Sequence, residues 1–200
     1  MLITNNKPTE IIQKIINACA SASNKKIVNE NETIHFNNKN NNECYLLISG
    51  EVTIRKNGTG KMITRIKSPY IFGFNYYPDS YIHTFSDAEF YVLPSNKAVD
   101  IIENKKLWKE MYYISNWYAN RCYTMIHILN QKSSKMIILN LLKKLYLEPI
   151  EYRYTITALQ YVQENSALSR SCIYSTLAQL GREGTIFIRR GVLISMHNLK

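Results

Sequence analysis

The spacing of apolar residues changes twice along this 200-residue chain and so divides it into three parts. In the first part, residues 8–20 place isoleucines at intervals of three and four, which predicts a short helix beginning at Pro8 and Thr9. From Lys26 to about Leu93, short alternating runs are separated by polar turns, and Asn57-Gly58 between two of them predicts a β-hairpin. Strands of this length and spacing are typical of a small barrel or roll.

The second change follows Pro94, where the spacing becomes helical. Residues 95–103 predict a short helix and residues 104–130 a long one. Apolar or aromatic side chains and one serine recur along the long helix at alternating intervals of three and four. These residues are Trp108, Met111, Ser115, Tyr118, Cys122, Met125 and Leu129. Such a stripe is typical of a dimer seam between two copies of a helix, and equally of packing against the chain's own roll.

Residues 131–200 begin with a short polar hinge and a predicted helix over 135–147. Thr157 and Gln160 then have the spacing of a capping box. In that motif the threonine hydroxyl accepts from the backbone N–H of the glutamine, and the glutamine side chain reaches back. We expect a short helix from there, ended by Asn165 in the left-handed conformation.

A second helix should follow the turn, capped by Ser169 and ended near Leu180 by Gly181. One of its faces is apolar and is expected to pack on the first helix. Small or polar residues on the opposite face would let the helix approach the major groove of DNA closely; they are Ser171, Tyr174, Ser175 and Ala178. Arg170 lies in the first turn, where a guanidinium can donate two hydrogen bonds to guanine.

Two alternating strands then surround Arg189-Arg190-Gly191 in the stretch TIFIRRGVLISM. A helix-turn-helix followed directly by a basic hairpin is the arrangement of a winged helix, in which the hairpin tip contacts backbone phosphate. Either part alone could be an ordinary surface feature, a polar helix or a charged turn. Their combination favours DNA binding.

The distribution of charge agrees with this interpretation. The chain has 25 lysines and arginines against 15 acidic residues, and residues 131–200 hold ten against four. Such a balance favours partners that carry phosphate, nucleic acid first and an anionic membrane surface second. No apolar run approaches the ~18–20 residues that span a bilayer, and the N-terminus lacks the pattern of a signal peptide. We therefore expect a cytoplasmic protein without a membrane segment.

Neither a metal site nor an enzyme motif is apparent. Cys19, Cys44, Cys122 and Cys172 are too far apart in sequence for a structural zinc site or an iron–sulfur cluster. The patterns GxSxG, HExxH, the P-loop and the dinucleotide fingerprint do not occur. The sequence therefore predicts a protein that is not an enzyme and carries no cofactor.

The order of the parts resembles the Crp/Fnr superfamily of bacterial transcription regulators over nearly the whole chain. LSRS at 168–171 is similar to that family's recognition helix, and YLLISGEVTIRK and SPYIFGF are similar to its roll. Within the superfamily, SPYIFGF, LWKE, LSRS and GVLISM are most similar to the enterobacterial type that inhibits hydrogen peroxide resistance. The resemblance implies an α+β chain with a cupin-like, cyclic-nucleotide-binding-like β-roll in residues 1–103. A long dimerisation helix in 104–130 and a winged helix-turn-helix in 131–200 would follow.

The resemblance also implies partners and contacts. The partners would be double-stranded DNA, a second copy of the chain and RNA polymerase. The predicted DNA-binding residues are Ser169, Arg170, Ser171, Cys172, Tyr174, Ser175, Arg189 and Arg190. Of these, Arg170, Ser171 and Ser175 match base-reading positions of the family, whereas Ser169 and Cys172 match positions near phosphate.

The sensor half departs from the cyclic-nucleotide-binding members. Where they have Gly-Glu, Gly73 is followed by Phe74, and the next segment, NYYPDSYIHTF, contains no arginine or lysine. A buried cyclic phosphate without a cation would cost roughly several kcal/mol. We therefore expect no response to cyclic nucleotides.

Three alternatives stay open, one for the function of the protein and two for the signal that it senses. The protein could be an interaction module that has lost its DNA role. It could sense a small molecule in an apolar pocket, although we expect the same residues to fill a closed roll: Tyr45, Ile71, Phe72, Phe74, Tyr76 and Tyr77. It could also sense oxidants through Cys122 on the helical seam, unless that residue is simply a buried apolar side chain, or through Cys172 beside the DNA surface.

Overall fold

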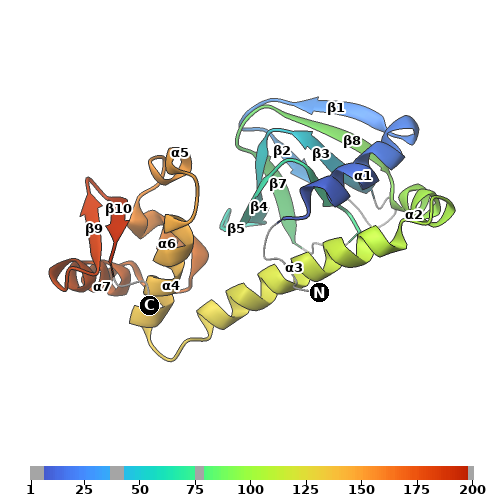
Figure 1. Cartoon of the computed structure of the whole chain (residues 1–200). Helices are drawn as coiled ribbons and strands as arrows, with labels where there is room; N and C mark the ends of the chain where they lie inside the picture. The colour runs from blue at the N-terminus through green and yellow to red at the C-terminus, as the bar shows by residue number, and fades with distance from the viewer. Residues whose placement is uncertain (1–6, 37–42, 75–78, 198–200) are drawn as a thin grey trace. The chain divides into compact units, whose positions relative to one another are not determined.

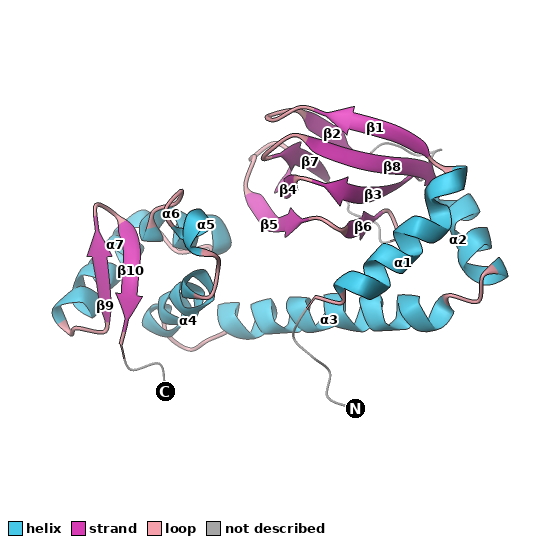
Figure 2. Cartoon of the chain, turned by 45° about the horizontal axis from the view of Figure 1, so that its top comes forward, coloured by secondary structure: helices cyan, strands magenta, loops and turns pink. Residues whose placement is uncertain are grey.

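The computed structural model describes residues 7–36, 43–74 and 79–197. The chain forms two compact units, Met1–Arg121 and Cys122–Lys200, each with its own hydrophobic core. Helix α3 (Trp108–Leu129) begins in the first unit and ends in the second. The predicted α+β fold, with antiparallel sheets first and a winged helix-turn-helix last, is confirmed (Figures 1 and 2).

The first unit is a β-roll made of two antiparallel four-stranded sheets. One has the strand order β1-β8-β3-β6 and the other β2-β7-β4-β5. The strands are β1 (Asn24–Val28), β2 (Thr33–His35), β3 (Glu43–Ser49), β4 (Glu51–Lys56), β5 (Met62–Lys67), β6 (Tyr70–Phe72), β7 (Ser80–Thr84) and β8 (Ala88–Pro94). The predicted hairpin at Asn57-Gly58 joins β4 to β5. The helices are α1 (Thr9–Cys19), a 3-10 turn (Ala20–Ala22) and α2 (Ser95–Asn104), and α1 contacts both α2 and β6.

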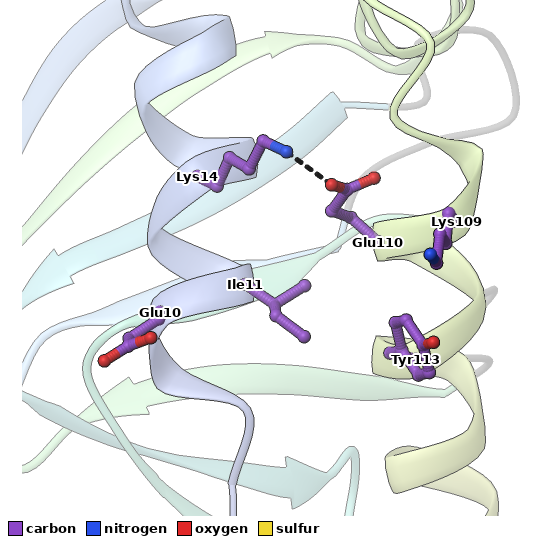
Figure 3. A pocket seen from close by; sticks show the side chains of 6 residues that line it. All are labelled: Glu10, Ile11, Lys14, Lys109, Glu110 and Tyr113. Atoms are coloured by element: carbon purple, nitrogen blue, oxygen red, sulfur yellow. Dashed lines mark hydrogen bonds and ion pairs between the residues drawn. The ribbon is translucent and has the colours of Figure 1, made fainter. Parts of the chain in front are cut away.

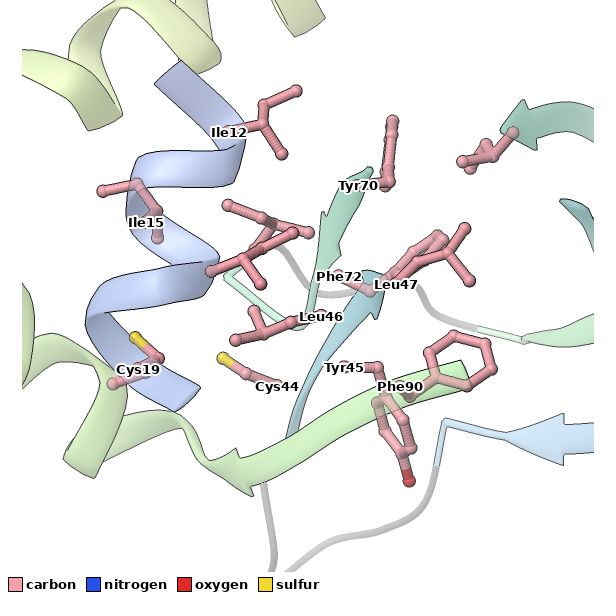
Figure 4. Packing of buried hydrophobic residues seen from close by; sticks show 14 of the residues in the cluster. Ile12, Ile15, Cys19, Cys44, Tyr45, Leu46, Leu47, Tyr70, Phe72 and Phe90 are labelled. Atoms are coloured by element: carbon pink, nitrogen blue, oxygen red, sulfur yellow. The ribbon is translucent and has the colours of Figure 1, made fainter. Parts of the chain in front are cut away.

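Side chains of the chain itself fill the roll. Figure 4 shows Ile12 and Ile15 of α1 beside apolar residues of β3 and β6. The aromatic and aliphatic residues that were considered as a pocket lining are part of this core: Tyr45, Ile71 and Phe72 are buried, and Phe74 packs against them. Tyr76 and Tyr77 lie outside the described residues.

Two of the cysteines belong to the same core. Cys19 of α1 and Cys44 of β3 are both fully buried (Figure 4). Burial raises the pKa of both thiols, that of Cys44 to about 11. Because a thiol reacts as the thiolate, both are poorly reactive in the folded chain.

A hollow on the surface lies between α1 and the start of α3 (Figure 3). Its lining residues are Glu10, Ile11, Lys14, Lys109, Glu110 and Tyr113. The ammonium of Lys14 donates to the carboxylate of Glu110 across it, and this hydrogen bond lowers the pKa of Glu110. The ion pair joins α1 to α3 across the hollow, so its lining residues contribute to the packing of these two helices.

The second unit contains α4 (Ser134–Tyr146), α5 (Ile150–Arg153), α6 (Ala158–Asn165) and α7 (Arg170–Arg182). The strands β9 (Ile186–Arg189) and β10 (Val192–Met196) form a two-stranded hairpin after them. Helices α4, α6 and α7 contact one another around a core of buried aliphatic side chains. Its members from the three helices include Ile138, Leu141, Leu142, Leu145, Val162, Ile173, Leu177 and Leu180.

Three details of the predicted helix ends were wrong. The long helix begins at Trp108, because Lys106 (φ +55°) breaks the chain between α2 and α3. Asn165 does not adopt the left-handed conformation. Its side-chain amide donates to the carbonyl of Tyr161 at 2.9 Å, and extended backbone follows. Gly181 lies inside α7, which continues to Arg182, and the left-handed glycine after the helix is Gly184 (φ +68°).

Within residues 7–36, 43–74 and 79–197, no helix is long and apolar enough to cross a bilayer. The same residues contain no group of three or more histidine, cysteine and acidic side chains that could hold a metal ion.

Candidate nucleic-acid interface

Side-chain caps fix the starts of the two helices α6 and α7. The hydroxyl of Thr157 accepts from the backbone N–H of Gln160 at 3.1 Å, which is the first half of the predicted capping box. The second half does not form, since the Gln160 side chain donates to Glu164 instead. The hydroxyl of Ser169 accepts from the backbone N–H of Cys172 at 3.3 Å, so Ser169 caps α7 as predicted. The backbone N–H groups at the start of α7 therefore lie at a defined, exposed position.

Helix α7 buries one side in the core of the unit and exposes the other. The buried residues are Ile173, Thr176, Leu177 and Leu180. The exposed residues include Arg170, Ser171, Tyr174, Ser175 and Ala178, as the sequence predicts. The Tyr174 side chain is 69% exposed, whereas Cys172 is only partly accessible. Between Arg170 and Ala178 the exposed face has short side chains apart from one arginine and one tyrosine, so a partner surface can approach the helix backbone closely there. Gln179 and Arg182 are also exposed, nearer the end of the helix.

The serine hydroxyls on this face are oriented by the helix. The hydroxyl of Ser175 donates to the carbonyl of Cys172 at 3.0 Å. The hydroxyls of Ser169 and Ser171 lie 3.1 Å apart. A serine whose proton is used within its own helix presents its oxygen lone pairs outward, so Ser175 offers an acceptor to an incoming donor.

The hairpin of β9 and β10 ends in a two-residue turn, Arg190-Gly191. Both residues have positive φ, +49° and +83°, as a type I′ turn requires. Arg189 and Arg190 are exposed on the hairpin. Arg189 therefore ends strand β9 and Arg190 begins the turn, so the two adjacent cations lie at the tip of the hairpin, as predicted.

A link between the hairpin turn and helix α6 was not predicted. The backbone N–H of Ala158, in the first turn of α6, donates to the carbonyl of Gly191 at 2.8 Å. A Cβ atom added at Gly191 would lie 2.9 Å from the Cγ2 atom of Thr157. The turn thus supplies an acceptor to a helix N-terminus, which fixes the hairpin against the helix pair. The glycine in the turn was visible in the sequence, but its long-range partner was not.

The interface carries positive charge that no carboxylate neutralises. Among the described residues, none of Arg170, Arg189 and Arg190 forms an ion pair. Glu183, one residue beyond α7, accepts from the ammonium of Lys135 at 2.8 Å. The hydrogen bond from Lys135, and then that from Gln179, holds the pKa of Glu183 below its usual range. The acidic group at this end of the helix is therefore already paired.

Residues 134–200 match the family model described as winged helix-turn-helix DNA binding. The C-terminal unit is a winged helix-turn-helix domain. In that domain α6 and α7 are the helix-turn-helix and the β9–β10 hairpin is the wing.

The chain is also similar to known proteins over most of its length. It is 25% identical over 179 residues to the inhibitor of hydrogen peroxide resistance of Escherichia coli strain K12, covering 86% of this chain and 84% of that protein. The protein of the same description from Salmonella typhimurium is 24% identical over 185 residues, covering 87% and 86%.

Solved structures resemble the chain in fold. The c-di-GMP responsive global regulator CLP of Xanthomonas campestris gives a TM-score of 0.69 at 13% identity, over 93% of this chain and 100% of that one. A CooA mutant from Carboxydothermus hydrogenoformans gives a TM-score of 0.71 at 12% identity, over 94% and 92%. The resemblance in fold to Crp/Fnr-type proteins, inferred from the sequence, is thereby confirmed.

The structure divides the predicted dimer residues of α3 into two groups. Trp108, Ser115, Cys122 and Leu129 are exposed. The other three pack on their own chain: Met111 is buried, the Tyr118 hydroxyl donates to the carbonyl of Ile71 at 3.0 Å, and Met125 contacts the second core.

Among the other exposed residues of α3 are three that continue the same spacing and that the sequence analysis missed, namely Tyr112, Ala119 and Ile126. With the four exposed predicted residues they form one stripe at alternating intervals of four and three. Cys122 lies on this stripe and is exposed in the single chain, not buried.

Proposed function

We propose that this chain is a homodimeric, sequence-specific DNA-binding transcription regulator of the Crp/Fnr type. The observation that carries the proposal is the exposed face of α7. That face carries Arg170 and several short polar side chains, and the wing of the same unit carries Arg189 and Arg190. None of these three arginines forms an ion pair with another described residue. In sequence-specific recognition, phosphate contacts position the protein on the duplex and base contacts from a helix in the major groove read the sequence. The wing and the capped helix α7 can supply these two kinds of contact.

Each predicted contact residue has a distinct role in this proposal. Arg170 donates two hydrogen bonds to O6 and N7 of a guanine. Ser175, whose proton is held by the carbonyl of Cys172, accepts from the amino group of an adenine or cytosine. Ser171 and Tyr174 contact base edges beside them, whereas Ser169 and Cys172 lie near a phosphate at the helix N-terminus. Arg189 and Arg190 contact the backbone phosphates from the wing.

The dimer forms along α3 in this proposal. The exposed stripe consists of Trp108, Tyr112, Ser115, Ala119, Cys122, Ile126 and Leu129. Its spacing is that of the a and d positions of a coiled coil, so two parallel copies of α3 would bury it. A twofold axis then sets the two recognition helices about one DNA turn, roughly 34 Å, apart and predicts an inverted-repeat operator.

The regulatory half is proposed to be degenerate. Buried side chains of the chain itself occupy the roll, and the segment NYYPDSYIHTF, where cyclic-nucleotide-binding members carry a cation, has no arginine or lysine. The relatives are named for inhibiting hydrogen peroxide resistance, so genes of peroxide defence are the first targets to examine. DNA binding also places the protein in the cytoplasm, with RNA polymerase as a further partner.

A binding titration tests the proposal. Affinity for several duplexes would be measured across a salt series for the wild type, Arg170→Ala and Arg189→Ala. We expect Arg189→Ala to weaken binding to all sequences and to reduce the slope of log K against log salt by about 1. Arg170→Ala should cost about 1–3 kcal/mol on the preferred sequence and relax base preference.

Lys97→Ala, which removes an exposed lysine from α2 in the first unit, is the matched control and should bind as the wild type does. Equal losses on every sequence for Arg170→Ala would contradict its role in base readout. Binding that does not depend on salt would instead favour the protein-interaction module.

A further inference from the structure

Three cations from distant parts of the sequence meet at one edge of the first unit. Lys7 precedes α1, Lys67 ends β5, and Arg121 lies on α3. The ammonium of Lys7 donates to the backbone carbonyl of Lys67. It also lies 5.8 Å from the ring centroid of Tyr70, so the cluster is gathered beside the first residue of β6.

An aromatic platform holds two of these cations, Lys7 and Arg121. The rings of Tyr70, Trp117 and Tyr118 contact one another with centroid separations of 5.1 to 6.1 Å. The hydroxyl of Tyr118 is fixed by the carbonyl of Ile71 at 3.0 Å. The guanidinium of Arg121 lies 5.1 Å from the ring centroid of Trp117. Cation–π contacts of this kind restrict the long side chains before a ligand arrives, which reduces the entropy that binding must remove.

Within the described part of the chain, no carboxylate forms an ion pair with Lys7, Lys67 or Arg121. Burial, the positive charge of Arg121 and that of Lys67 lower the pKa of Lys7 to about 8, and no carboxylate is among the causes. Glu51 is the cross-strand partner of Lys67 in the sheet, but its carboxylate is paired with Arg65. The cations of the cluster therefore repel one another, and a bound anion would offset this repulsion.

We infer that Lys7, Lys67 and Arg121 form a binding site for a phosphate group, either free inorganic phosphate or the phosphate of a small monoester. The planar guanidinium supplies two parallel N–H donors to a phosphate, and the two ammonium groups supply point charges. Trp117 and Tyr70 are only 5% and 8% exposed, and the cations lie over their rings. Neither ring offers a free face to a base, so the site recognises the phosphate and not the group esterified to it.

This site is independent of the proposed DNA contacts. Its residues belong to Met1–Arg121, whereas the helix-turn-helix and the wing belong to Cys122–Lys200. It also lies outside the segment that follows Gly73, where the cyclic-nucleotide-binding members carry their phosphate cassette. Binding of phosphate can therefore be measured on the full chain without DNA, and its failure would leave the proposed function untouched.

Isothermal titration calorimetry of the full chain tests the site, with inorganic phosphate in one series and adenosine 5′-monophosphate in another at an ionic strength held constant with chloride. We expect saturable binding of both anions with similar affinity. Lys7→Gln and Arg121→Gln should each weaken it about tenfold or more. Lys14→Gln is the matched control, because it removes a cation from α1 that already pairs with Glu110. Its affinity should equal that of the wild type.

Three results would overturn the inference. These are no saturable heat from either anion, unchanged affinity in both glutamine variants, or binding of the nucleotide without binding of inorganic phosphate. If a variant fails to fold, NMR of the wild type decides. The guanidinium resonance of Arg121 should shift in proportion to occupancy, and a resonance that stays fixed through the titration would also refute the site.

Discussion

The link between the wing and the helix pair leads to a quantitative prediction for Gly191→Ala. Gly191 has φ +83°, and its carbonyl accepts from the backbone N–H of Ala158 at 2.8 Å. An alanine there meets two obstacles. Its backbone must hold a conformation unfavourable for L residues, and its Cβ would lie 2.9 Å from the Cγ2 atom of Thr157. The turn has to move away from α6, and the hydrogen bond is stretched or lost.

The magnitude follows from these two effects. The left-handed conformation costs an alanine about 1–2 kcal/mol relative to glycine. Losing the hydrogen bond to Ala158 adds about 0.5–1.5 kcal/mol. We therefore expect the free energy that protects the Ala158 amide to fall by about 1.5–3.5 kcal/mol, which makes its hydrogen exchange about 10- to 400-fold faster.

Hydrogen exchange followed by NMR on the full-length chain measures this effect at the Ala158 amide itself. Gly184→Ala is the matched control, since Gly184 also has positive φ (+68°) but no atom within 4 Å of the added Cβ. It should lose only the backbone contribution, about 1–2 kcal/mol. Equal acceleration of exchange at Ala158 in the two variants would refute the argument that Gly191 fixes the wing to α6.

Three further predictions concern the cap of α7, the half-buried Lys7 and the cysteines. Ser169→Ala should destabilise the winged helix-turn-helix domain by about 1 kcal/mol and Ser169→Gly by only a few tenths, as measured by urea unfolding; equal losses would contradict the capping role. The pKa of Lys7 is lowered to about 8, and between that value and its ordinary 10.5 the unfolded chain binds more protons, so Lys7 makes stability rise with pH there. Wild type should accordingly gain stability relative to Lys7→Met as pH increases from about 7 to about 10, and a relative loss would contradict the sign. In alkylation followed by mass spectrometry, Cys172 should react in the folded chain, while Cys19 and Cys44, buried and with raised pKa, should react only on unfolding; early labelling of Cys44 would contradict its burial.

Local signals in the sequence predicted most of the fold. Asn57-Gly58 marks a hairpin, Thr157 and Ser169 mark helix starts, and the apolar spacing of α7 identifies its buried face. Each of these features depends on residues a few positions apart, which is the range over which spacing and capping rules apply.

The errors arose where distant contacts or competing side chains decide. Asn165 was expected to turn the chain, but its amide bonds to Tyr161, so the helix end needs no left-handed residue. The two possible seams of α3 look alike in sequence. Only the packing of Met111 and Tyr118 on the roll shows that the exposed stripe passes through Tyr112 and Ala119 instead.

The same division between local and long-range features applies to the candidate site. The exposed residues of α7 and the charge of the wing follow from local pattern, because helix periodicity and turn chemistry place them. The bond between Ala158 and Gly191 and the cluster around Lys7 do not, since they join segments that are far apart along the chain.

The most direct test of the account is selection of operators by the purified protein from a random duplex library at two salt concentrations, with sequencing of the bound DNA. The account predicts an enriched inverted repeat with half-sites about one turn apart, retained by Lys97→Ala and lost or relaxed by Arg170→Ala. Enrichment of no sequence by the wild type, with retention that only falls as salt rises, would contradict sequence-specific readout by α7.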